Sequence, residues 1–127
     1  MICGGTLSDS ASRALEQLAD ETGTSAAPII VAAFGAYVAA LTGSEDLVLS
    51  LPVSGRVTVS LRRSGGMMSN IVPLRLHVPA DTTTGELVDA VRTRLTGALR
   101  HQRYRHEDIR RDLDGGSGEA GFFGPAV

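Results

Sequence analysis

The apolar run from Ile29 to Leu41 constrains the fold more than any other feature of this 127-residue chain. Thr24 and Ser25 are candidate N-caps, and Pro28 falls in the first turn of the predicted helix, where its missing N–H costs little. A membrane-spanning helix needs about 20 apolar residues, and this run is shorter. We therefore expect a helix buried in a protein core.

Composition narrows the classes of protein to which the chain can belong. Hydrophobic residues make up 43% and charged residues 20%, which suffices for one domain core or part of a larger one. The net charge of −2 argues against a general nucleic-acid-binding protein. With Cys3 as the single cysteine, the chain has no internal disulfide and no multi-cysteine zinc site. The N-terminus lacks a secretion signal, so we expect a cytoplasmic protein with no membrane partner.

Periodicity predicts the remaining elements. Apolar residues recur at helical spacing from Leu7 to Ala19, with Ser8 or Asp9 as the N-cap, and Gly23 ends this helix. After the apolar helix, EDLVLSLPV predicts a strand and SGRVTVSLRRSGG a loop. The next segment, MMSNIVPLRLHV, alternates as a half-buried strand does, and its apolar face consists of Val72, Leu74, Leu76 and Val78.

Two more helices and a strand-like tail complete the chain. Thr83 and Glu86 have the spacing of a capping box, which predicts a helix start. A short helix is expected over Glu107–Leu113, and the tail FFGPAV reads as a truncated strand. The order α-α-β-β-α-α predicts an α/β two-layer sandwich. Its core would pack the helix Ile29–Leu41 against the strands Leu47–Val53 and Val72–Val78.

The segment RHQRYRHEDIRRDL contains two of the three histidines and tempts an assignment as an active site. His101 and His106 are five residues apart, which places them about 140° apart on a helix rather than on one face. Glu107 and Asp108 are acidic residues of the kind favoured in a first helical turn. We therefore expect no metal site and no acid–base pair here.

Three other patterns in the sequence are weak evidence for a functional site. His77 and Asp81 form an H-x-x-x-D pattern, the spacing used by several acyltransferase families. Ser54 precedes a glycine but lacks the G-x-S-x-G turn of serine hydrolases. From Arg92 to Arg111 there are seven arginines and two acidic residues, an excess of 7 − 2 = 5 positive charges. This excess fits either a solvated helix face or a docking patch for an acidic partner.

Three motifs in order resemble the condensation domains of nonribosomal peptide synthetases. AAFGAYVAALTGSEDLVLSLPVSGR resembles the family's apolar helix, strand and SGR loop. GGMMSNIVPLRLHV resembles its N-x-x-P-L-R strand, and HQRYRHEDIRRDL its HQ-x-Y segment. The matches cover roughly residues 6–125. The resemblance implies a chloramphenicol acetyltransferase-like fold, in which two lobes enclose a tunnel.

The resemblance also implies which part of the domain this is. The family's catalytic motif, H-H-x-x-x-D-G, belongs to an N-terminal lobe, and this chain has no His-His pair. His77 and Asp81 lie beyond the P-L-R strand and are followed by Thr82 instead of glycine. Residues 1–127 therefore resemble an incomplete C-terminal lobe. We assign no catalytic residue and expect the chain to be inactive alone.

Function and partners follow from the family. With its N-terminal lobe, such a chain would form amide bonds between carrier-bound aminoacyl or peptidyl thioesters. The implied partners are the N-terminal condensation lobe, peptidyl carrier domains and neighbouring synthetase domains. No covalently bound cofactor is implied, and phosphopantetheine arms of the carriers would deliver the substrates.

Two groups of residues are assigned by the resemblance. A group expected to line the tunnel consists of Ser54, Gly55, Arg56, Met67, Met68, Ser69 and Asn70. A group expected to be structural, because it matches the HQ-x-Y segment, consists of His101, Gln102, Tyr104 and Glu107. Arg105 and His106 depart from the family's Pro-Phe.

Two alternatives remain open from sequence alone. The chain can be a non-catalytic module that docks a carrier or another partner through its arginine-rich helix. It can also be a stand-alone acyltransferase that uses His77 at an oligomer interface.

A lobe that normally buries one face should expose apolar surface around Met67, Met68 and Phe122–Phe123. We therefore expect the purified chain to self-associate and to bind a hydrophobic dye. Sedimentation velocity over a range of concentrations and dye fluorescence measure this. A monomer at high concentration without dye binding would contradict the assignment to half a domain.

Overall fold

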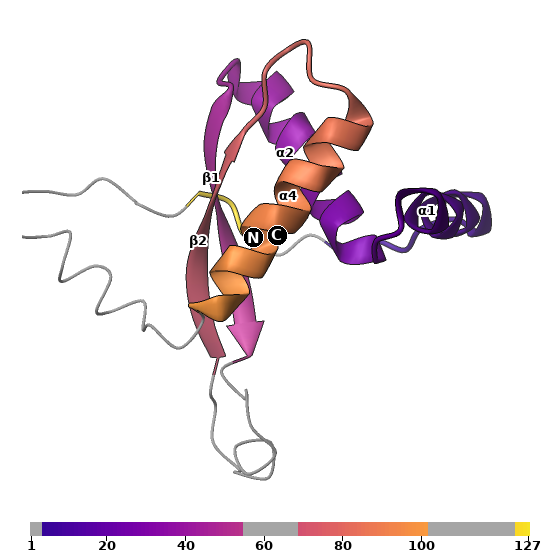
Figure 1. The fold of residues 1–127 in the computed structure, drawn as a ribbon, viewed down its shortest axis with the longest axis horizontal. Helices are drawn as coiled ribbons and strands as arrows, with labels where there is room; N and C mark the ends of the chain where they lie inside the picture. Colours follow the sequence, from indigo (N-terminus) through magenta and orange to yellow (C-terminus); the bar gives the residue numbers. More distant parts are fainter. Residues whose placement is uncertain (1–3, 55–68, 102–123) are drawn as a thin grey trace, which may run out of the picture.

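The computed structural model describes residues 4–54, 69–101 and 124–127. Its elements, in chain order, are α1 (Asp9–Thr22), α2 (Ala26–Thr42), β1 (Asp46–Ser54), β2 (Ser69–His77) and α4 (Thr84–Arg100). Figure 1 shows α2 and α4 side by side on one face of the β1–β2 sheet, with α1 set off to one side. The predicted two-layer arrangement of helices on a sheet is therefore present, whereas Glu107–Leu113 lies outside the described residues.

The first helix begins and ends at the predicted residues. The Ser8 hydroxyl accepts a hydrogen bond from the Ala11 amide at 3.3 Å, and Gly23 ends the helix in the left-handed conformation with φ 61°. No residue of α1 is fully buried, although Leu15 and Leu18 pack against the core. Among the described residues no single helix is long and apolar enough to cross a membrane; α1 and α2 meet that test only as a pair bent by 108°.

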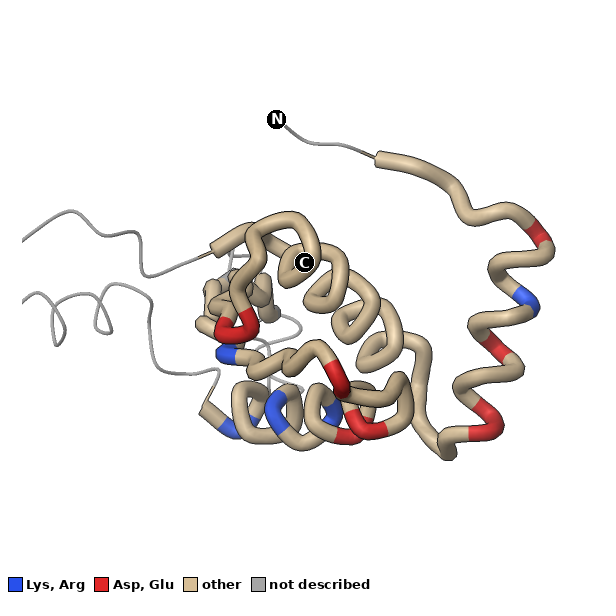
Figure 2. Tube along the Cα trace, turned by 90° about the horizontal axis from the view of Figure 1, so that it is seen from above, with Lys and Arg blue, Asp and Glu red and all other residues tan. Residues whose placement is uncertain are grey.

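The prediction that Ile29–Leu41 is buried holds for one face of the helix only. Its inner face packs against α4 and β1 and consists of Pro28, Ile29, Val31, Ala32, Gly35 and Val38. On its outer face Ile30, Tyr37 and Leu41 are 48%, 61% and 71% exposed. The sheet, α4 and α1 all contact α2, and these described elements leave its outer face largely exposed. Figure 2 shows that charged residues gather on α1 and α4, whereas α2 carries none.

The β1–β2 hairpin supplies the sheet side of the hydrophobic core. The strands pair antiparallel, with Leu49 opposite Leu74 and Leu47 opposite Leu76. Because side chains alternate across a strand, these four leucines lie on one face, under the helices. All four are at most 7% exposed. A Cβ on Gly35 would lie 3.0 Å from Leu76 Cδ1, so α2 packs closely on this face. The alternation predicted for Val72–Val78 is confirmed.

Residues 124–127 lie against the other edge of β1. The Ser50 amide donates to the Pro125 carbonyl and the Val127 amide donates to the Ser50 carbonyl, each at 3.0 Å, which forms a parallel bridge. The buried Ser50 hydroxyl donates to the Gly124 carbonyl at 2.7 Å. The end of the predicted strand-like tail therefore pairs with the sheet, while Phe122–Phe123 lies outside the described residues.

The helix α4 begins with the predicted capping box. The Glu86 amide donates to the Thr83 hydroxyl at 3.4 Å, and the Thr83 amide donates to a Glu86 carboxylate oxygen at 2.9 Å. The Thr83 hydroxyl also donates to this carboxylate, and these hydrogen bonds hold the pKa of Glu86 below its usual value. The buried face of α4 consists of Leu87, Val88, Val91 and Leu95.

Gly124→Ala is expected to detach the tail from β1. A Cβ at this position would overlap the backbone carbonyl of Val48, which cannot move without breaking the sheet. We expect a loss of about 1–3 kcal/mol in unfolding free energy and faster hydrogen exchange at the Val127 amide. Gly97→Ala is the matched control, because a Cβ there meets open space. Unchanged exchange at Val127 in the Gly124 variant would contradict the tail pairing.

Candidate functional site

Strand pairing brings together two of the motifs that the sequence places in the candidate tunnel. Ser54, the last residue of β1, pairs with Ser69, the first residue of β2, and Val53 pairs with Asn70. The SGR and MMSN segments therefore leave the sheet at the same end of the hairpin. Asn70 is half-buried, on the face of the sheet that carries the buried Val53. The other four candidates lie outside the described residues and are Gly55, Arg56, Met67 and Met68.

The structure shows an ion pair on the outer face of the hairpin that was not predicted from the sequence. Arg75 Nε donates to Asp46 Oδ1 at 3.0 Å and Arg75 Nη2 to Asp46 Oδ2 at 2.5 Å, a bidentate contact. Hydrogen bonding from Arg75 holds the pKa of Asp46 below its usual value; desolvation opposes this, and attraction from Arg75 and His77 adds to it. Both side chains are exposed, so the pair is expected to add little to the stability of the fold.

His77 lies at the opposite end of the hairpin from Asn70. It is exposed on the outer face, directly opposite Asp46 in the register. Asp81 is exposed in the turn that follows, and within the described part of the chain neither His77 nor Asp81 makes a side-chain hydrogen bond or ion pair. Their spacing therefore does not produce an oriented histidine–carboxylate pair. The described residues also contain no cluster of His, Cys, Asp and Glu suited to a metal ion.

His101 follows the last residue of α4. Its backbone amide donates to the Ala98 carbonyl at 3.1 Å, and the residue is exposed. The structural role expected for the His101 side chain stays a prediction. Gln102, Tyr104 and Glu107, with Arg105 and His106, lie outside the described residues.

Two hollows border the α4 layer. One, of about 800 Å³, lies between β2 and α4 and is lined by Val72, Pro73, Leu74, Arg75, Ala90, Thr93, Arg94, Gly97, Ala98 and His101. The other, of about 670 Å³, lies between α2 and the β2–α4 connection and is lined largely by alanines of α2, with Glu45 as its charged residue. Of the described residues that were predicted for the functional site, only His101 lines either hollow.

Two polar contacts were not predicted from the sequence, for a common reason. Asp46 and Arg75 are neighbours only through the diagonal of the antiparallel register, and Ser50 meets Gly124 only through the tail. A serine within the apolar run LVLSLPV was the available signal for a buried polar contact. A charged residue on each strand of the hairpin was the sequence signal for the ion pair. Predicting the pair also requires the register of the two strands, which the sequence does not give.

Comparisons with known proteins identify the family. The family model described as "Condensation domain" matches residues 5–127. The dimodular nonribosomal peptide synthase of Bacillus subtilis (strain 168) is 36% identical over 99 residues, which are 78% of this chain. The first condensation domain of the CDA synthetase superposes on this chain with a TM-score of 0.80 at 38% identity. The match covers 88% of this chain. The chain belongs to the condensation domain family of nonribosomal peptide synthetases, and the predicted resemblance is confirmed.

A more distant solved structure supports the fold alone. The condensation domain from Monacolin K polyketide synthase MokA matches 96% of this chain with a TM-score of 0.88 at 21% identity. The chain spans only part of each protein that it matches: 4% of the dimodular synthase, 24% of the CDA synthetase domain and 29% of the MokA domain.

Asp46→Asn is expected to remove a pH-dependent contribution to stability. Because the pKa of Asp46 is lowered from 3.8 in the folded state, the ion pair stabilises the fold above that pH and is lost as the pH falls through the lowered pKa. The difference in unfolding free energy between wild type and variant should be largest near pH 7 and should shrink below pH 4. Denaturant titrations at a series of pH values measure it.

The control for this experiment is Asp81→Asn, another exposed carboxylate near the same end of the hairpin, without an ion pair among the described residues. It is expected to leave the denaturation midpoint at neutral pH unchanged. An Asp46→Asn variant that follows the wild-type curve at every pH would show that the bidentate contact contributes nothing.

Proposed function

We propose that this chain is most of the C-terminal lobe of a condensation domain, with a chloramphenicol acetyltransferase-like fold. Joined to an N-terminal lobe that carries H-H-x-x-x-D-G, it would form amide bonds between carrier-bound aminoacyl or peptidyl thioesters. The observation that carries the proposal is the family match over residues 5–127 in a chain without a His-His pair. A catalytic base must come within hydrogen-bonding reach of the attacking amine, and this chain supplies no oriented candidate among its described residues.

The proposed contribution of the lobe is one wall of the tunnel. The register of the hairpin supports this, because Ser54 and Ser69 lie side by side where the two motifs leave the sheet. Ser54, Gly55 and Arg56 would form a loop that approaches the substrate closely and supplies one fixed charge. Met67 and Met68 would give an adaptable apolar surface for varied acyl groups, and Ser69 and Asn70 would supply hydrogen bonds.

The proposed partners are the N-terminal lobe, peptidyl carrier domains with their phosphopantetheine arms, and neighbouring synthetase domains. The dimodular relative is far longer than this chain, which covers 4% of it, as expected of one part of a multidomain synthetase. The stand-alone acyltransferase with His77 at an oligomer interface is the second candidate; it is not preferred, because Asp81 makes no contact that orients His77 among the described residues. A docking role through the arginine-rich segment fits within the same proposal.

The test is a transfer assay between two loaded carrier domains, followed by mass spectrometry. The isolated chain is expected to form no amide product, since it contains no base placed to deprotonate the amine. Mixing it with the N-terminal lobe of a related condensation domain, such as that of the CDA synthetase, is expected to restore turnover.

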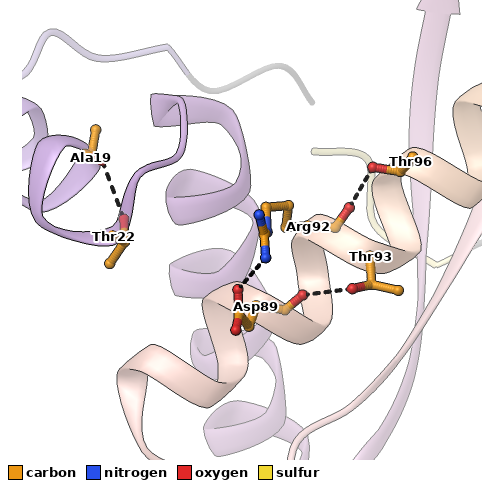
Figure 3. A network of polar contacts seen from close by, with 6 residues as sticks. All are labelled: Ala19, Thr22, Asp89, Arg92, Thr93 and Thr96. Carbon is orange, nitrogen blue, oxygen red and sulfur yellow. Dashed lines mark hydrogen bonds and ion pairs between the residues drawn. The ribbon is translucent and has the colours of Figure 1, made fainter.

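Variants separate the tunnel wall from structural residues in the reconstituted enzyme. Arg56→Ala and Asn70→Ala should lower turnover about tenfold or more, because misplaced substrate is costly. Arg13→Ala is the matched control, since Arg13 is exposed on α1 and lies outside the arginine-rich segment, whereas Arg92 lies within that segment and pairs with Asp89 at 2.8 Å (Figure 3). His101→Ala should act mainly on the stability of the chain and only secondarily on the turnover of the reconstituted enzyme. Transfer by the isolated chain that disappears in His77→Ala would overturn the proposal in favour of the stand-alone acyltransferase.

A further inference from the structure

We draw no further inference here: the strongest candidate, the hollow of about 670 Å³ between α2 and the β2–α4 connection, is lined mainly by small and apolar side chains with the exposed Glu45 as its charged residue, and nothing in the structure shows what covers it.

Discussion

The antiparallel pairing of β1 with β2 is the constraint on which the rest of the structure depends. It aligns Leu49 with Leu74 and Leu47 with Leu76 on one face, and those leucines form the floor on which α2 and α4 pack. A one-residue slip would turn these side chains to the outer face and expose the core. The same register brings Asp46 within reach of Arg75 and aligns Ser54 with Ser69. The packing of the core, the Asp46–Arg75 ion pair and the candidate site therefore all depend on the register of β1 and β2.

The helix α2 is adapted to more contacts than the described residues give it. Its sequence carries no charge, and an evenly apolar helix is normally covered on every side. Its inner face meets the sheet and α4, whereas Tyr37 and Leu41 remain largely exposed. The amphipathic α1 likewise has no fully buried residue. Both observations agree with a chain that spans 24% of a related condensation domain.

Sequence reasoning worked best where a short-range pattern decides the outcome. The caps at Ser8 and Gly23, the Thr83–Glu86 box and the alternation of β2 depend on neighbours within a few residues. The three motifs likewise identified the family correctly. Reasoning was weaker for the burial of α2, because burial depends on which other elements are present. It judged the His77–Asp81 pattern weak but left it open, and among the described residues neither side chain makes a hydrogen bond or ion pair with the other.

By itself, the sequence determined the helices α1, α2 and α4, the two strands, the inward face of β2 and the family, because periodicity, capping and motif order are local or linear properties. Tertiary structure alone decided that residues 124–127 pair with Ser50 and that Asp46 holds Arg75. It also decided that α4 packs over β2, with the 800 Å³ hollow between them. These contacts join residues far apart in the chain. They exist only once the antiparallel register and the packing of α4 have placed their backbones a few ångströms apart.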